Sequence, residues 1–569
     1  MKRRSEIIEF PITNYQEQRT NPMNASIIAL IGILWFVIAY KWYGKKIEQK
    51  LVQPSDANVT PANELYDNVD YVPTKAPILF GHHFSSIAGA GPIIGPILAF
   101  SLFGWLPTLL WILLGTVFMG AVHDYASLMA SVRSKGVSIT EIAERSVSKT
   151  ARWIFSVFVW LTLALVQAVF AVLTAQTLEQ KPEIVIPTIG LIFLAVAFGW
   201  SVYRRGSNLM ISTIIALITI FIFILIGDYY PVYASYDFWL LFCIVYAFIA
   251  ATIPVWILLQ PRDYLSMYLL LAGLVLGFIG LFVTNPTINA PAFISLQSSN
   301  GPLWPILFIT VACGAISGFH SLVGSGTSAK QLAKESDGKK IAFGGMLTEG
   351  ALALLVIVLM GSVLYWGKAP SEELNGFIFQ DLLKQSANIT FGTALGKVLN
   401  SLGIPLFMGI AFGVLMLNAF ILTTLDTTVR LARYIVQESV GTKFKLFSNR
   451  YIAASLGLIL AYLLTQGNNW KIIWPVFGAS NQLVAALALF VATAYWFGYK
   501  RPRRFTLLPA IFMLITTEAA LVYQLFWQYI PTKNYILAVT ATILIILGVI
   551  VAIEVFKCIK QVEPKNKGI

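Results

Sequence analysis

Charged residues are scarce in this chain. Asp, Glu, Lys and Arg together make up 12% of its 569 residues, whereas an ordinary soluble domain carries about 25%. Because the deficit extends over the whole length, the composition excludes a large water-soluble enzyme. A disordered chain is excluded as well, since 57% of the residues are apolar and disordered segments are poor in such residues.

Cysteine is nearly absent. Cys243, Cys313 and Cys558 are far apart in the sequence and have no metal-ligand spacing. They predict neither a disulfide-stapled secreted fold nor a zinc site. The H-E-x-x-H, G-x-S-x-G and P-loop motifs are also missing. We therefore expect no enzyme activity, no resident metal and no cofactor.

Apolar sequence is what the chain has in abundance. Its mean hydropathy is +0.74, and a membrane helix needs about 20 consecutive, mostly apolar residues. We predict an all-α polytopic membrane protein with about fifteen transmembrane helices. The predicted spans run near 26–43, 83–103, 106–131, 152–175, 184–203, 208–227, 238–259, 265–284, 303–325, 343–366, 402–425, 451–466, 470–497, 506–526 and 535–556.

Lysine and arginine indicate the orientation. With alternate connections placed on opposite sides, most of the 40 Lys and Arg residues fall on the side of the C-terminus. Because basic residues accumulate in cytoplasmic loops, we expect an outer N-terminus and a cytoplasmic C-terminus in the plasma membrane. The basic segment at residues 2–4 is the exception to this pattern. The net charge of +13 then faces lipid headgroups rather than nucleic acid.

The chain divides into three parts on this pattern. Residues 1–25 form an N-terminal tail and the start of the first span, 26–435 form a transport core, and 436–569 form accessory helices with a cytoplasmic tail. The longest connections, 44–80 and 367–401, are too short to be sizeable soluble domains. Any function must therefore lie in the helical bundle.

Glycine and proline cluster near 89–96, at membrane depth. The cluster includes Gly89, Gly91, Pro92, Gly95 and Pro96. Close helix packing would explain the glycines but not the prolines, which interrupt helices. Irregular backbone at this depth is tolerated where it lines a cavity or is buried in protein. We predict a discontinuous helix at a binding site.

A weaker interruption is predicted at 250–254, around Thr252 and Pro254. It lies five spans after the first and in the opposite orientation. Paired broken helices in two inverted repeats are typical of LeuT-like transporters, so we expect the two breaks to be adjacent at mid-membrane. The alternative is a simple proline kink, which is common in helices.

Two polar groups are further candidates for substrate or ion binding. Ser317, Ser321 and Ser325 recur every four residues in one span, so they share a helix face, and His320 and Thr327 are close by in the sequence. The amides of Asn481 and Gln482 adjoin each other in a later span. The alternative for both groups is hydrogen bonding between packed helices.

Ionisable residues inside the spans require an explanation, because each costs about 2.5–3.5 kcal/mol near a helix centre. We predict proton coupling by His82, His83, His123 and Asp124, with a satisfied interhelical hydrogen bond as the alternative for each. Glu349, Asp426 and Glu518 are further examples. No Lys or Arg lies deep in a predicted span, so an anionic substrate would depend on broken-helix amides or a protonated histidine.

Asp426 and Arg430 are four residues apart near the cytoplasmic end of the span at 402–425. A helix brings such a pair together. We predict a salt bridge between them that acts as a cytoplasmic gate or as an end anchor.

Several of these segments together resemble the carbon starvation protein A (CstA) family. The matching segments, in order, are GHHF at 81–84 with IAGAGP at 87–92 and GP at 95–96, QPRDYL at 260–265, GAISGFH at 314–320 with SGT at 325–327, LDTT at 425–428 with Arg430, and FGASNQL at 477–483. The resemblance runs from about residue 26 to 500.

The resemblance implies a plasma-membrane uptake system that is used when preferred carbon is scarce. Members of this family are peptide transporters or proton-coupled pyruvate carriers, in a superfamily with a LeuT-like fold. We therefore expect a secondary transporter that moves small peptides or pyruvate, with protons. The alternatives are a nutrient sensor built on a transporter scaffold and an ion or solute channel.

Overall fold

The computed structural model describes residues 23–67, 70–254, 257–441, 443–466 and 470–561. The basic segment at residues 2–4 and the last residues of the cytoplasmic tail, 562–569, lie outside this part of the chain. Helices make up 80% of the structure, which confirms a mostly helical fold. The described residues include one two-stranded antiparallel pair, in which β1 (Gln297–Ser298) lies beside β2 (Gly301–Pro302).

The helices of the first half of the chain lead up to a loop at 285–296. They are α1 (Ala25–Ile38), α2 (Lys45–Ile47), α3 (Pro61–Glu64), α4 (Ala76–Ile87), α5 (Gly91–Phe103), α6 (Trp105–Gly115), α7 (Ala121–Val132), α8 (Ile139–Ser146), α9 (Lys149–Gln180), α10 (Val185–Gly199), α11 (Leu209–Tyr229), α12 (Tyr236–Thr252) and α13 (Leu259–Thr284).

The helices of the second half begin directly after the strands. They are α14 (Leu303–Val311), α15 (Gly318–Gly326), α16 (Gly344–Ser362), α17 (Phe379–Gln385), α18 (Ala387–Asn400), α19 (Leu406–Ser439), α20 (Lys445–Ser448), α21 (Arg450–Thr465), α22 (Trp470–Gly498), α23 (Arg504–Gln524) and α24 (Tyr535–Gln561).

Length and composition identify the membrane-spanning helices. Among the described residues, 12 helices are long and apolar enough to cross a membrane, or 13 with the bent pair α4–α5 counted as one span. The protein is thus a multi-pass membrane protein. Two predicted spans, 238–259 and 451–466, correspond to the shorter apolar helices α12 and α21. The predicted total of about fifteen spans requires both of these shorter helices to cross the membrane, so it stays a prediction.

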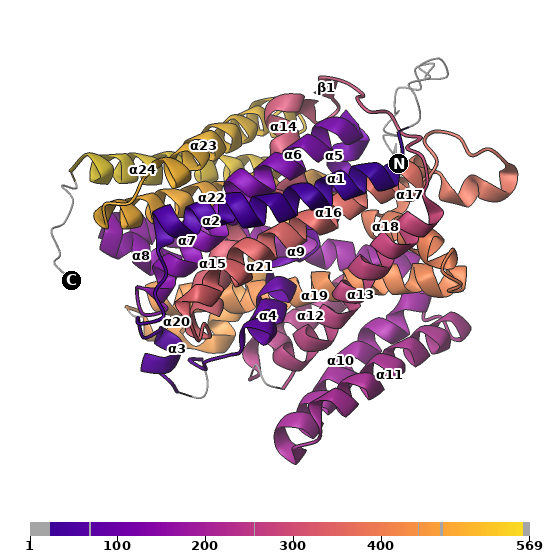
Figure 1. The fold of residues 1–569 in the computed structure, drawn as a ribbon, viewed down its shortest axis with the longest axis horizontal. Helices are drawn as coiled ribbons and strands as arrows, with labels where there is room; N and C mark the ends of the chain where they lie inside the picture. The colour runs from indigo at the N-terminus through magenta and orange to yellow at the C-terminus, as the bar shows by residue number, and fades with distance from the viewer. Residues whose placement is uncertain (1–22, 68–69, 255–256, 442, 467–469, 562–569) are drawn as a thin grey trace.

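Helix α22 is buried inside the bundle, and the pair α10 and α11 lies at its edge (Figure 1). The apolar part of α22 is wholly buried, and α22 packs against α7, α9, α14 and α15. At the edge, α10 and α11 pair with each other, and most of α11 is exposed. α22 therefore occupies the interior, although it follows the predicted transport core in sequence.

The first predicted helix break is present and is short. Helix α4 ends at Ile87 and α5 begins at Gly91, and the two axes differ by 44°. Pro92 lies in the first turn of α5, where backbone N–H groups have no helical partner in any case. The interruption is thus confined to 88–90, and Gly91, Pro92 and Gly95 belong to the helix that follows.

Two more interruptions lie elsewhere in the bundle. Helix α12 ends at Thr252, and Ile253 is extended, so the chain leaves the helix at the second predicted position. A third break, which we did not predict as one, separates α14 from α15. There Ala312 has a φ of 47°, a value that is rare for a residue with a side chain, and a helix resumes at Gly318.

The first and third breaks lie against each other. A Cβ atom added to Gly91 would lie 2.5 Å from Sγ of Cys313, and one added to Gly95 would lie 2.3 Å from the carbonyl oxygen of Val311. Glycine permits this close approach of two backbones. The first break therefore has the third break, at 312–317, as a direct neighbour, and adjacency of the first break to 250–254 stays a prediction.

Candidate functional site

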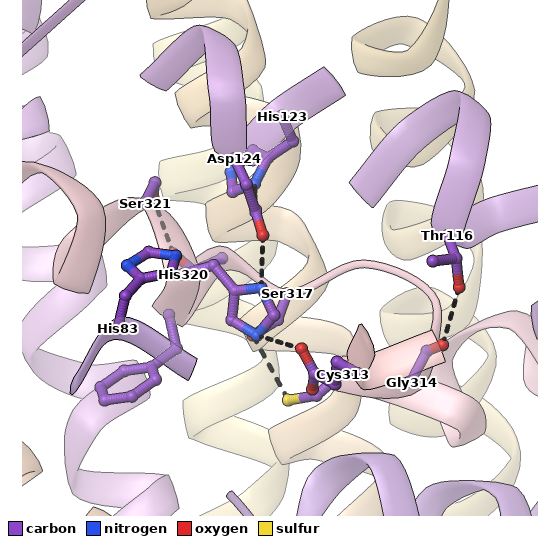
Figure 2. Close-up of polar contacts among 12 residues, drawn as sticks. His83, Thr116, His123, Asp124, Cys313, Gly314, Ser317, His320 and Ser321 are labelled. Atoms are coloured by element: carbon purple, nitrogen blue, oxygen red, sulfur yellow. Dashed lines mark hydrogen bonds and ion pairs between the residues drawn. The ribbon is translucent and has the colours of Figure 1, made fainter. Parts of the chain in front are cut away.

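Four buried ionisable side chains form a continuous row near the third break. His123 Nδ1 lies 2.7 Å from Oδ1 of Asp124, whose Oδ2 lies 2.8 Å from Nδ1 of His320. On the other side of the ring, Nε2 of His320 lies 3.1 Å from Oε2 of Glu349. Figure 2 shows Asp124 on the helix of His123, directed at the ring of His320. We call these four residues the relay.

The relay comes from three helices and is shielded from solvent. His123 and Asp124 lie on α7, His320 on α15 and Glu349 on α16. All four are at most 2% exposed. Imidazoles and carboxylates alternate along the row, so a proton on His320 is stabilised from both ring nitrogens. The described residues include no group of three or more His, Cys, Asp and Glu placed to hold a metal ion.

The third break puts His320 in the first turn of α15, and α22 holds the break in place. Oδ1 of Asn481 accepts hydrogen bonds from the amide of Phe319 at 3.1 Å and from the hydroxyl of Ser317 at 3.3 Å. The Gln482 amide donates to the carbonyl oxygen of Phe308 at 2.6 Å. Backbone groups freed at a break need such partners at membrane depth.

Two more side chains satisfy carbonyl groups of the same break. The Trp474 indole donates to the carbonyl oxygen of Thr310 at 3.2 Å, and the Thr116 hydroxyl donates to that of Gly314 at 3.1 Å. The amides of Asn481 and Gln482 are thus bonded to the protein's own backbone. This geometry matches the packing alternative for them.

The predicted row of hydroxyl groups is mostly turned to its own helix. Ser321 donates to the carbonyl oxygen of Gly318 at 2.7 Å, and Ser325 donates to that of Ser321 at 2.6 Å. Thr327 donates likewise to Val323. Ser317 differs, because its hydroxyl faces Asn481 and Cys313 at the break. Of the predicted row, only Ser317 lies in the unwound segment.

The histidines of α4 are not bonded into the relay. Nδ1 of His83 lies 2.7 Å from the hydroxyl of Ser328, and His82 is half-buried. Two of the four predicted proton-coupling residues, His123 and Asp124, are in the relay. His320, which we predicted as a substrate or ion ligand, and Glu349 complete it. The signal for Glu349 was a lone carboxylate in an otherwise apolar span.

A second buried ionic cluster joins α12, α13 and α19. The Arg262 guanidinium donates to both oxygens of Asp426, through Nη1 to Oδ2 and through Nη2 to Oδ1 at 3.0 Å. Tyr246 donates to the same carboxylate at 3.1 Å, and Nη2 of Arg262 also lies 3.2 Å from Oδ1 of Asp263. Arg262 is 1% exposed and Asp426 is fully buried. We call these residues the gate cluster.

One prediction about this region is wrong. Asp426 pairs with Arg262 rather than with Arg430, whose guanidinium donates to the carbonyl oxygens of Ala250 and Ile253 at 2.7 and 2.8 Å. Arg430 thereby satisfies the carbonyls freed where α12 ends. Arg262 is buried in the first turns of α13, close to the end of that span. Sequence spacing reveals a partner within one helix but not across helices.

The first break lies beside α19 as well as beside the third break. A Cβ atom added to Gly89 would lie 2.7 Å from the hydroxyl oxygen of Thr424, two residues before Asp426 on α19. Gly91 meets Cys313 at the third break. The segment at 88–90 therefore adjoins both α19, which carries Asp426, and the unwound segment that leads to His320.

The model of the family "Carbon starvation protein CstA" matches residues 24–376 and 378–520. The chain belongs to the CstA family. The "Peptide transporter CstA" of Bacillus subtilis (strain 168) is 33% identical, over 94% of this chain and 97% of the relative. The "Pyruvate/proton symporter BtsT" of Escherichia coli (strain K12) is 32% identical, over 90% of this chain and 83% of the relative.

A solved structure gives this CstA-family chain a distant fold neighbour. The manganese transporter of Eremococcus coleocola matches with a TM-score of 0.51 at 11% identity, over 87% of this chain and 99% of that chain. At this identity the likeness concerns the fold alone.

Proposed function

We propose that this CstA-family protein is a proton-coupled secondary transporter of the plasma membrane that takes up small peptides or pyruvate when preferred carbon is scarce. The observation that carries the proposal is the relay, a buried row of alternating imidazoles and carboxylates next to two broken helices that meet. Support for the substrates comes from the relatives, which are named as peptide transporters and as a pyruvate/proton symporter.

The relay is the proposed carrier of the coupling proton. His320 lies between Asp124 and Glu349, so binding or losing one proton changes the charge of the row at a place that water does not reach. A buried charge change of this kind has a large energetic effect, and it can bias which side of the transporter is open. The proposed proton site therefore shifts from the histidines of α4 to His320, Asp124 and Glu349.

The proposed test is transport into proteoliposomes that contain the full chain. With a bath more acidic than the lumen, labelled pyruvate or a labelled dipeptide should accumulate above its external concentration, and a protonophore should abolish the accumulation. Counterflow without a pH gradient should persist and saturate with substrate. The proposal would be contradicted if neither pyruvate nor the dipeptide showed saturable counterflow.

Glu349→Gln tests the relay within the same assay. It keeps the size of the side chain and removes its negative charge, so we expect counterflow to remain and pH-driven accumulation to be lost. Asp381→Asn is a matched control, because Asp381 is exposed and pairs with exposed Lys384. Accumulation that survives in Glu349→Gln would move the proton site elsewhere.

The alternatives give different results in this assay. A channel would show flux without counterflow, and a sensor would bind substrate without either. The LeuT-like inverted-repeat core also remains our proposal, as does the outer N-terminus. The proposed LeuT-like core is supported by broken helices whose unwound segments meet. Structures of inward-open and outward-open states would test this core.

A further inference from the structure

We propose that Asp263 is a second proton-binding site, which controls the gate cluster by competing with Asp426 for the guanidinium of Arg262. This inference rests on the proposed function, because it takes proton-coupled transport as the purpose of the gate. It assigns a role to the QPRDYL segment, whose arginine and aspartate are both buried, and it names a site separate from the relay.

The competition follows from one shared donor. Nη2 of Arg262 lies 3.0 Å from Oδ1 of Asp426 on α19 and 3.2 Å from Oδ1 of Asp263 on α13. Asp426 has the stronger position in this structure, since it also receives Nη1 of the guanidinium and the hydroxyl of Tyr246. Asp263 is next to Arg262 in the sequence, so it remains within reach if α19 moves away.

The charges of the gate cluster do not balance with two ionised carboxylates. Arg262 supplies one positive charge, Asp263 and Asp426 supply up to two negative charges, and all three side chains are at least nine-tenths buried. Asp263 faces Arg262 on its own helix α13, and it faces Asp426 and Thr423 on α19. Tyr246 on α12 faces the carboxylate of Asp426. Arg430 on α19 is turned to the carbonyl groups of α12. A proton on one carboxylate restores the balance, because an unpaired buried charge is costly.

Asp263 is the carboxylate that takes this proton, since it has fewer donors than Asp426. When Asp263 is neutral, Arg262 is committed to Asp426, and α13 is held against α19. When Asp263 loses its proton, it attracts the same guanidinium and weakens the link to α19. Loss of a proton thus favours opening between α13 and α19.

The experiment measures the separation of α13 and α19 rather than transport. Spin labels are attached to Gln260→Cys on α13 and Tyr434→Cys on α19, both exposed, in full-length protein with Cys558→Ser. Distance distributions are then recorded at about pH 6 and about pH 8, because a buried carboxyl group can exchange its proton near neutral pH. We expect a long-distance population that grows as the pH rises, by up to about tenfold per pH unit for a single proton.

Three variants and one control variant separate the possible causes. Asp263→Asn mimics the protonated residue, so the short distance should persist at both pH values. Asp426→Asn should give the long distance at both, because Arg262 is left with Asp263. Glu349→Gln in the relay should keep the pH response of the parent, and exposed Asp237→Asn is the matched control.

The results distinguish this inference from the proposed function. A parent protein whose distances do not change with pH, or an Asp263→Asn variant that responds as the parent does, would overturn the role of Asp263. A pH response that requires Asp263, in a protein that transports neither pyruvate nor peptides, would support the gate and overturn the proposed substrates.

Discussion

The Arg262 guanidinium on α13 holds the Asp426 carboxylate on α19 through both of its oxygens. The two residues are 164 positions apart in the sequence, and neither is accessible to water. A buried charge that loses its partner is costly, whereas a pair removed as a whole leaves no unpaired charge behind. The loss of one partner and the loss of both should therefore have very different effects on the free energy of unfolding.

Asp426→Ala should lower the free energy of unfolding by about 3–5 kcal/mol, because it leaves the buried guanidinium without its main partner. The double variant Arg262→Met with Asp426→Leu should be less destabilised than Asp426→Ala alone, since it removes the buried guanidinium together with its main partner and Asp263 can remain neutral by holding a proton. Melting temperatures of the purified proteins in one detergent test this order. A double variant that melts below Asp426→Ala would show that the pair stabilises the fold beyond charge compensation.

His320→Gln should abolish pH-driven accumulation and leave counterflow intact, because glutamine cannot carry the proton held between Asp124 and Glu349. His82→Gln is the control histidine, since His82 is half-buried and not bonded into the relay. Uptake into proteoliposomes with and without a pH gradient measures both. Equal loss of accumulation in the two variants would argue against a relay centred on His320.

Gly95→Ala should be destabilising, because its Cβ would lie 2.3 Å from a backbone carbonyl oxygen that cannot rotate away. Forced separation of the two breaks should cost about 1–3 kcal/mol, the usual range for overpacking. Gly326→Ala is the matched control, since a Cβ there meets nothing within 4 Å. The difference in melting temperature between the variants is the measurement, and equal temperatures would contradict close contact of the breaks.

Ser321→Ala should leave the apparent affinity for substrate unchanged, because the hydroxyl bonds within its own helix. The stability should change by a few tenths to about 1.7 kcal/mol, as for other hydrogen bonds in membrane helices. Ser317→Ala should have the larger effect on KM, since Ser317 lies in the unwound segment. Measuring KM and melting temperature on both variants tests this, and a tenfold loss of affinity in Ser321→Ala would return its hydroxyl to the binding site.

The sequence was sufficient for features that depend on neighbouring residues. Pro92 and Pro96 predicted the break before α5, and His123 with Asp124 predicted half of the relay. Features that depend on contacts across the bundle were out of reach. The break at Ala312 contains no proline, and only the backbone, held by Asn481 and Gln482, reveals it. The partner of Asp426 was misassigned for the same reason.

Helix α22 has a consequence for attempts to reduce this protein to a minimal transporter. A chain cut after residue 435 would keep every residue of the relay and of the gate cluster. It would lose Trp474, Asn481 and Gln482, and with them the partners of three backbone groups around the break that positions His320. Such a fragment would carry the chemical groups of the site without the scaffold that aligns them, so residues 470–498 belong to the smallest unit that we expect to work.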